Sequence, residues 1–427
     1  MAIIKVQDDC RTGRTSVSIF GLKFSYINQK LVTRPDYCYP LSKIREKYKN
    51  KQKVRVGFLV NENCKWNAED LYNLLENNEN FEPIVLVTLY DTRHNKKDFT
   101  KPSVQDNFDF FKNSGKRVLK VYDEEKEKYL DLKEFDIDIL FYQQPWGLDK
   151  IQSIENVAKN SICCYFSYGI GIFECAVNVR PFHEKLFYYF VSDEATKNLY
   201  KKFEINNLDN LTVVGYPKLD VYNDLPQTPT AKTTVIYAPH HSYKRGLKIG
   251  TFDKTGEQIL AFAKVHPEYR WVFKPHPDLK EVLYTDKHYG PDFTENYYSQ
   301  WEEIGEIYDK GNYFGLFMAS DILITDCSSF LLEYMPTLKP IIRLERLGSQ
   351  KVSALGKEFL KGMYRVRNVS EMSRCLEALK QKDSLLEVRN DLTKNVLRKE
   401  KNACANIVKK LEIICTGEDV NSRGENI

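Results

Sequence analysis

The sequence predicts an α/β protein built from two doubly wound, Rossmann-like domains, with further helices at the C-terminus. Short apolar runs rich in β-branched residues alternate with helical patterns, as in parallel sheets covered by helices. The length of 427 residues exceeds that of a usual single domain. A polar, proline-rich stretch, residues 223–232, separates two alternating halves and is the expected interdomain linker.

The first alternating half covers residues 54–222 and follows a polar, irregular leader, residues 1–53, that contains one hairpin-like segment. Buried parallel strands are typically continuous apolar runs, whereas helices place apolar residues three or four positions apart. Strands are therefore expected at residues 54–60, 84–89, 117–121, 138–142, 162–166 and 186–191. Helices are expected at residues 68–75, 148–157 and 194–203.

The second alternating half covers residues 233–383 and repeats the same pattern. Its strands are expected at residues 234–238, 270–274, 321–325 and 340–343, and its helices at residues 255–265, 313–319 and 329–335. Residues 384–414 are charged with apolar spacing, which predicts one or two C-terminal helices. The tail, residues 415–427, is expected to be disordered.

Composition excludes several classes of protein. No apolar run approaches the roughly 20 residues that span a bilayer, and the start lacks the plan of a signal peptide, so we expect a cytoplasmic protein. A net charge of +4 does not indicate nucleic-acid binding. The ten cysteines are scattered without CxxC or Cys/His ligand spacing, so we expect reduced thiols and no metal site. We also expect no cofactor.

One basic stretch deserves a separate interpretation. Residues 43–53 (KIREKYKNKQK) follow an aromatic-rich segment, residues 20–26. Basic residues beside exposed aromatic rings can hold a protein at an anionic membrane surface, here the inner face of the cell membrane. The alternative, which we favour, is a solvated basic linker before the first domain.

Three polar turns of the second half, each after an expected strand, predict a binding site. The first turn, after residues 321–325, opens a helix with Ser328 and Ser329, and Thr325 precedes it. The unpaired amides of a helix start and nearby hydroxyls suit phosphate. The alternative is that a serine merely caps the helix. Asp326 is expected to shape the turn, since a carboxylate repels a diphosphate.

The other two turns supply titratable groups. His240, His241 and Ser242 follow one strand directly, and if strand geometry persists the two adjacent rings point in opposite directions, so at most one reaches the site. Lys274 ends another strand, and His276 lies between two prolines that restrict its backbone. We expect His276 first, and His240 or His241 second, to act in proton transfer or phosphate contact. Lys274 is either a phosphate contact or, as we favour, a solvated lysine.

Four short motifs together resemble those of one family. They are residues 325–334 (TDCSSFLLEY), 273–277 (FKPHP), 213–220 (VVGYPKLD) and 238–242 (APHHS). This ordered set resembles the phosphate, K/R-x-HP and hinge motifs of the CDP-glycerol glycerophosphotransferase family, the teichoic-acid and capsule polyol-phosphate transferases. The resemblance covers residues 54–380 and implies a GT-B fold, in which two Rossmann-like domains face a central cleft.

The resemblance implies a function and assigns residues to it. The chain is expected to transfer glycerol phosphate, or a related polyol phosphate, from a CDP-activated donor to a hydroxyl of a polysaccharide or lipid-linked acceptor, releasing CMP. In GT-B transferases a carboxylate near Glu333 often holds the ribose; the alternative is a surface glutamate. At strand ends of the first half, the acceptor-side candidates are Gln144, Trp146, Tyr168 and Gly171.

One departure from the family leaves the catalytic base open. Many teichoic-acid polymerases carry an HGT-type motif whose histidine is proposed to be the base, but the corresponding residues 165–171 (YFSYGIG) contain no histidine. The alternatives to polyol-phosphate transfer are a GT-B glycosyltransferase that uses a nucleotide sugar in capsule or lipopolysaccharide synthesis, a nucleotide-sugar epimerase, and a non-catalytic nucleotide-binding component of a capsule assembly complex.

Overall fold

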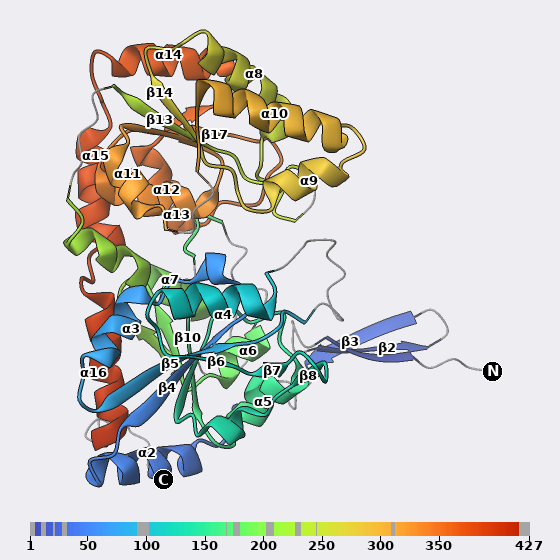
Figure 1. Ribbon diagram of the computed structural model, residues 1–427, viewed down its shortest axis with the longest axis vertical. Coiled ribbons are helices and arrows are strands. Elements are labelled where there is room, and N and C mark those ends of the chain that lie inside the picture. The colour runs from blue at the N-terminus through green and yellow to red at the C-terminus, as the bar shows by residue number, and fades with distance from the viewer. Residues whose placement is uncertain are drawn as a thin grey trace. The chain divides into compact units, whose positions relative to one another are not determined.

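The computed structural model describes residues 5–9, 14–19, 22–27, 32–91, 102–167, 169–173, 180–201, 209–226, 232–244, 246–308 and 312–417 (Figure 1). The chain forms two compact units. Within the described ranges, unit 1 contains residues up to 167, residues 180–220 and residues 400–417. Unit 2 contains residues 169–173 and residues 221–399.

Unit 1 is built on a parallel sheet of seven strands in the order β12-β11-β10-β9-β4-β5-β6. The strands are β4 (Val54–Val60), β5 (Phe81–Val87), β6 (Val118–Lys120), β9 (Ile139–Tyr142), β10 (Ile162–Phe166), β11 (Tyr188–Val191) and β12 (Leu211–Val213). Almost every residue of β4, β9 and β10 is buried, which explains their continuous apolar sequences.

Helices cover the sheet of unit 1. They are α2 (Cys38–Lys49), α3 (Glu69–Glu76), α4 (Val104–Asn113), α5 (Ile154–Val157), α6 (Arg180–Lys185), α7 (Glu194–Lys201) and α16 (Ala403–Thr416). The C-terminal helix α16 packs against α2 and α3. Leu71 of α3 and Ile407 and Leu411 of α16 are fully buried in the same hydrophobic core as the sheet. Helix α16 is therefore part of unit 1, although it follows unit 2 in the sequence.

The N-terminal residues are more regular than the expected leader. Strands β1 (Lys5–Asp9), β2 (Arg14–Ile19) and β3 (Leu22–Ile27) form a three-stranded antiparallel sheet, and α2 follows. The basic stretch lies largely on α2, where Lys43 and Lys47 form ion pairs with Asp136 and Asp138. These two lysines are neutralised within unit 1 rather than solvated.

Unit 2 is built on a parallel sheet of six strands in the order β15-β14-β13-β16-β17-β18. The strands are β13 (Thr234–Ala238), β14 (Arg270–Phe273), β15 (Gly305–Ile307), β16 (Ile322–Thr325), β17 (Ile341–Leu344) and β18 (Tyr364–Val366). The central strand β13 pairs with β14 on one side and with β16 on the other. Ala238 lies opposite Thr325, so these two strands end together.

Helices α8, α10 and α14 lie on one face of this sheet, and α11, α12 and α13 lie on the other (Figure 1). The helices of unit 2 are α8 (Phe252–Lys264), α9 (Leu279–Thr285), α10 (Gly290–Ile304), α11 (Phe314–Ala319), α12 (Ser328–Tyr334), α13 (Ala354–Phe359), α14 (Val369–Leu379) and α15 (Leu386–Leu392). Tyr237 and Phe273 of the sheet are fully buried with Tyr297 and Trp301 of α10. The first face is therefore an aromatic core.

The structure confirms the predicted fold class of two Rossmann-like α/β domains. Some elements differ in detail. The helix expected at residues 148–157 breaks at Ser153 into a 3-10 turn, Lys150–Gln152, and α5. The expected linker and tail lie partly outside the described residues, at 227–231 and 418–427. Among the residues that the structure describes, no helix has both the length and the apolar character needed to cross a membrane.

Candidate functional site

The candidate site lies in unit 2 at the point where successive strands begin to be added to the opposite side of the sheet. From β13 the chain adds β14 and β15 on one side, and it then crosses to add β16 on the other. In open parallel sheets, ligands bind at such a switch point, outside the carboxyl ends of the strands. Here the residues after β13 and β16 are His240, His241, Asp326 and Ser328.

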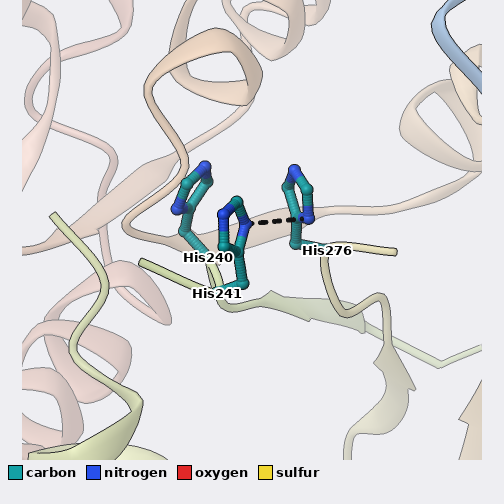
Figure 2. A group of neighbouring side chains, drawn as sticks. All are labelled: His240, His241 and His276. Atoms are coloured by element: carbon teal, nitrogen blue, oxygen red, sulfur yellow. Dashed lines mark hydrogen bonds between the residues drawn. The ribbon is translucent and has the colours of Figure 1, made fainter. Parts of the chain in front are cut away.

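Three histidines come together at this edge of the sheet (Figure 2). The ring centroids are 4.4 Å apart for His240 and His241, 4.1 Å for His241 and His276, and 4.7 Å for His240 and His276. The expectation that His240 and His241 point in opposite directions is wrong. The chain bends after Pro239, so the alternation of a strand no longer applies to the two rings.

Backbone amides determine the tautomer of two of these rings. The amide of Ser242 donates to Nδ1 of His240 at 3.1 Å, and the amide of Asp278 donates to Nδ1 of His276 at 3.1 Å. An imidazole nitrogen that accepts an N–H bond carries no proton, so the neutral rings carry theirs on Nε2. Nδ1 of His241 lies 3.0 Å from Nδ1 of His276. Because Nδ1 of His276 has no proton, His241 is the donor in this bond.

The neutral cluster therefore has a defined chemical character. His240 and His276 present N–H groups at Nε2, whereas His241 presents a lone pair at Nε2. Burial and the neighbouring His241 lower the pKa of His240 well below its ordinary value, which keeps His240 neutral. Two hydrogen-bond donors beside one proton acceptor can hold an anionic oxygen and remove a proton from a hydroxyl.

The same atoms bear on the question of a metal. Ligand atoms of His240, His241 and His276 lie within 4.8 Å of one another, a spacing that could hold an ion. Metal binding requires an unprotonated nitrogen from each ring. The amide bonds use the lone pairs of His240 and His276 at Nδ1, and only His241 presents one at Nε2. Metal-independent chemistry therefore stays our expectation.

Asp326 holds the residues after β13 in place. This buried carboxylate accepts the amide of His240 at 2.6 Å and both the amide and the hydroxyl of Thr251, at 2.5 and 2.8 Å. Burial nevertheless raises the pKa of Asp326 to about 6. Gly250 makes this approach possible, because a Cβ there would lie 2.4 Å from the carbonyl oxygen of His240.

Two hydroxyl groups that the sequence predicts as phosphate contacts donate instead to acceptors within the protein. Ser242 Oγ lies 2.9 Å from Nδ1 of His240 and donates to that unprotonated nitrogen. Thr325 Oγ1 donates its proton to the carbonyl of Ala238 at 2.6 Å. Ser242 therefore orients His240, and Thr325 joins β13 to β16. Neither hydroxyl proton is directed to a ligand.

The two serines of α12 are not helix caps. The cap position belongs to Cys327, which makes no side-chain cap bond. Ser328 Oγ instead accepts the amide of Ile172 at 3.0 Å, and Ser329 Oγ contacts the Cys327 sulfur at 3.5 Å. Ser328 thus keeps its proton for donation. Among the described residues, no hydrogen bond makes either serine a cap.

Gly171 lies beside Ser328, within unit 2. A Cβ at Gly171 would be 2.7 Å from Ser328 Oγ. This contact within unit 2 does not support Gly171 as an acceptor-side candidate of the first domain. The next residues fix this segment, since the amide of Ser353 donates to the carbonyl of Ile172 at 2.9 Å. Tyr168, the neighbouring candidate, lies outside the described residues.

Lys274 and Glu333 are both buried and share one aromatic partner. Nζ of Lys274 lies 5.3 Å from the ring centroid of Tyr313, and the rings of Tyr308 and Phe330 also face it. The hydroxyl of Tyr313 donates to the carboxylate of Glu333. The favoured interpretation of Lys274 as a solvated strand-end lysine is wrong, and so is the surface alternative for Glu333, because both side chains are enclosed.

Gln144 and Trp146 lie in unit 1, after β9. Gln144 is buried and donates to the carboxylate of Glu62 at 2.9 Å, and Trp146 is half-buried. Sequence analysis missed Glu62, Thr251 and the ring of Tyr313. Of these three residues, only Glu62 could have been identified from the sequence as a candidate site residue, because it follows a buried strand almost directly.

Comparison with known proteins finds one matching family. Residues 178–345 match the family described as CDP-Glycerol:Poly(glycerophosphate) glycerophosphotransferase. This segment contains β13, β14, β16 and all three histidines. Over these residues the chain is similar to this family. This match confirms the resemblance inferred from the motifs and supports a transferase. No curated protein matches the chain.

Solved structures with the same fold have low sequence identity. The wall teichoic acid polymerase TagF, as a variant soaked with CDPG, is 14% identical with a TM-score of 0.55, over 90% of this chain and 95% of that chain. UDP-GlcNAc 2-epimerase from Neisseria meningitidis, bound to UDP-GlcNAc, is 14% identical with a TM-score of 0.52, over 84% of this chain and 100% of that chain. These likenesses support the GT-B fold of the family and nothing beyond the fold.

Proposed function

We propose that this transferase moves glycerol phosphate, or a related polyol phosphate, from a CDP-activated donor to a hydroxyl of a cell-surface polysaccharide or lipid-linked acceptor. The observation that carries the proposal is the three-histidine cluster at the switch point of unit 2. It combines N–H donors for phosphoryl oxygens with one proton acceptor, and it lies inside the segment that matches the family.

The reaction requires three tasks at the transferred phosphoryl group. The acceptor oxygen forms a bond to the distal phosphorus, while the bond from that phosphorus to the bridging oxygen breaks and CMP leaves with the electron pair. Nε2 of His241 takes the hydroxyl proton. The Nε2–H groups of His240 and His276 stabilise the negative charge on the phosphoryl oxygens, as preorganised donors do in other active sites. General-base catalysis of this kind contributes about 10²–10⁴-fold in rate.

The remaining residues of unit 2 hold the donor. Ser328 retains a hydroxyl proton for a phosphate oxygen, and Ser329 lies beside it at the start of α12. Lys274 supplies positive charge from its aromatic surroundings. Glu333 is held by Tyr313 and is the candidate for the ribose hydroxyls. This set has one charged group of each sign, which matches a nucleotide that carries both phosphates and hydroxyls.

Product identification tests the proposal. The protein is incubated with CDP-glycerol and a glycerol phosphate oligomer, and the released nucleotide is separated by ion-exchange chromatography. CMP release that depends on the acceptor is the expected result. A nucleoside diphosphate released from a nucleotide sugar, with no reaction of CDP-glycerol, would instead support a glycosyltransferase. No turnover of either donor would support a non-catalytic nucleotide-binding protein.

Peripheral membrane contact is a weaker part of the proposal. Leu22, Phe24 and Tyr26 of β3 are 54–66% exposed, which supports contact with a lipid surface. Lys43 and Lys47 do not support it, because carboxylates of unit 1 neutralise them. Cosedimentation with vesicles that contain anionic lipid tests the contact. We expect Phe24→Ser with Tyr26→Ser to reduce binding several-fold, and equal binding of variant and wild type would contradict it.

A further inference from the structure

Unit 1 has a switch point of its own, and buried polar residues occupy it. From β4 the chain adds β5 and β6 on one side and then crosses to add β9 on the other. Asn61 and Glu62 follow β4, and Gln143 and Gln144 follow β9. All four side chains are at least nine-tenths buried. Since ligands bind outside the carboxyl ends of strands at a switch point, this edge is where a ligand of unit 1 is expected.

The four residues have two different tasks. Gln143 joins the two strand ends: its Oε1 accepts the amides of Asn61 and Glu62 at 3.3 and 3.1 Å, and its Nε2 donates to the carbonyl of Glu62 at 2.8 Å. These bonds satisfy the backbone and are sufficient to hold the strand ends together. The remaining side chains therefore need another explanation.

Those side chains form a charged cluster around Glu62. Lys65 Nζ forms an ion pair with Glu62 Oε1 at 2.5 Å and donates to Gln144 Oε1 at 2.9 Å. Gln144 Nε2 donates to the same Glu62 oxygen at 2.9 Å and to Asn61 Oδ1 at 2.6 Å. A carboxylate, an ammonium group and two amides thus converge within hydrogen-bonding distance of one another.

Folding alone does not favour such a cluster. Glu62 is buried, whereas the side chain of its ion-pair partner Lys65 is 23% exposed. Burying a carboxylate costs desolvation energy that an ion pair often fails to recover, and an apolar residue of similar size would serve the core as well or better. The half-buried ring of Trp146 lies next to the cluster, with its centroid 6.0 Å from Lys65 Nζ. Carboxylate, amide and ammonium groups beside an indole are the groups that bind hydroxyls and pack against the carbon skeleton that carries them.

We propose that Glu62 and Lys65, together with the Trp146 ring, bind the polyol hydroxyls of the acceptor, and that Asn61 and Gln144 position Glu62. Glu62 accepts hydrogen bonds from the hydroxyls, and Lys65, whose side chain is 23% exposed, donates to them. Gln144 is a positioning residue because its Nε2 already donates to both Asn61 and Glu62. This inference rests on the proposed function, which supplies a hydroxylated acceptor. It adds Glu62 and Lys65, two charged residues, to the acceptor-side candidates Gln144 and Trp146.

Steady-state kinetics with the full chain tests the site. Glu62→Gln keeps the size of the side chain and removes the charge, and Trp146→Ala removes the ring. Because a hydrogen bond to a charged group contributes about tenfold or more in affinity, we expect Glu62→Gln to raise the KM for a glycerol phosphate oligomer at least tenfold. The KM for CDP-glycerol is measured beside it, because loss of an acceptor contact should change the acceptor KM more than the donor KM.

The matched control is Glu155→Gln. Glu155 of α5 also forms an ion pair in unit 1, with the buried Lys185, but away from the strand ends. The Glu155→Gln variant should have the same acceptor KM as the wild type. A folded Glu62→Gln variant and a folded Trp146→Ala variant that both keep the wild-type acceptor KM would overturn the inference, as would an equal effect of Glu155→Gln.

A binding measurement separates this inference from the proposed function. If the wild-type protein releases no CMP from CDP-glycerol under any condition, the proposed function fails. The site is then still tested by isothermal titration calorimetry, in which the glycerol phosphate oligomer is titrated into the protein. Binding to the wild type that weakens at least tenfold in Glu62→Gln supports it, and absent or unchanged binding overturns it.

Discussion

Nδ1 of His241 donates a hydrogen bond to Nδ1 of His276 over 3.0 Å, and this bond links the residues that follow β13 and β14. Its direction follows from the amide of Asp278, which also donates to Nδ1 of His276 and therefore requires that this nitrogen carry no proton. The three histidines therefore have different chemical roles. Nε2 of His241 carries no proton in this tautomer and suits a base, whereas His276 and His240 suit oxyanion binding.

Asp326→Asn should disturb this arrangement without touching a ligand. The Asp326 carboxylate accepts hydrogen bonds from the amides of His240 and Thr251. In the asparagine variant an NH2 group would replace one carboxylate oxygen, so one of these amides would lose its acceptor. We expect the free energy of unfolding of unit 2 to fall by about 1–3 kcal/mol, since a buried donor loses its partner. We also expect kcat to fall, because His240 shifts. Thermal unfolding and initial rates measure the two effects; unchanged values of both would contradict this role of Asp326.

The free energy of unfolding of unit 2 should depend on pH because Asp326 titrates. The pKa of Asp326 is raised to about 6 in the folded protein, above its ordinary value of 3.8. The folded state therefore binds a proton more tightly than the unfolded state between these values. This contribution to stability is fully present below about pH 4 and is lost as pH rises through about 6. It amounts to about 3 kcal/mol.

Comparison of wild type with Asp326→Asn isolates that contribution. The difference between their free energies of unfolding should increase as the pH falls from 7.5 to 4.5. Chemical denaturation at several pH values measures it. Parallel curves for the two proteins would show that Asp326 ionises as it does in an unfolded chain.

Tyr313→Phe should weaken both unit 2 and donor binding. The substitution keeps the ring beside Lys274 and removes the hydroxyl that donates to the buried carboxylate of Glu333. We expect a loss of about 1–3 kcal/mol in stability and weaker binding of CDP-glycerol. Tyr308→Phe is the control, because Tyr308 also faces Lys274 but its hydroxyl donates to the exposed carbonyl of Asn312. Equal effects of the two variants would contradict the role of Glu333.

Gly171→Ala should act through Ser328. The new Cβ would lie 2.7 Å from Ser328 Oγ and would force that hydroxyl to rotate away from the amide of Ile172. We expect several-fold weaker binding of CMP, close to the effect of Ser328→Ala. A double-mutant cycle measured by calorimetry tests the connection. Additive effects would contradict it, since both changes should remove the same hydroxyl.

The sequence was sufficient for the fold and for the strand ends that carry the site. Buried parallel strands have continuous apolar sequences, and prolines and histidines mark where β13 and β14 end. The direction of the His240 ring was not predictable, because it depends on Asp326, which lies 86 residues along the chain. The surroundings of Lys274 were missed for the same reason: Tyr313 and Phe330 belong to other elements of the fold.

The three histidines themselves offer the most direct test. Glutamine places an N–H donor near the position of Nε2 but cannot accept a proton, so it replaces the donor function of His276 and not the basic function of His241. The single-turnover rate of CMP release from CDP-glycerol, with acceptor present, is measured for His241→Gln and His276→Gln. We predict a loss of about 10²-fold or more for His241→Gln and a clearly smaller loss for His276→Gln. Wild-type rates in both variants would contradict a phosphoryl-transfer centre at this edge of unit 2.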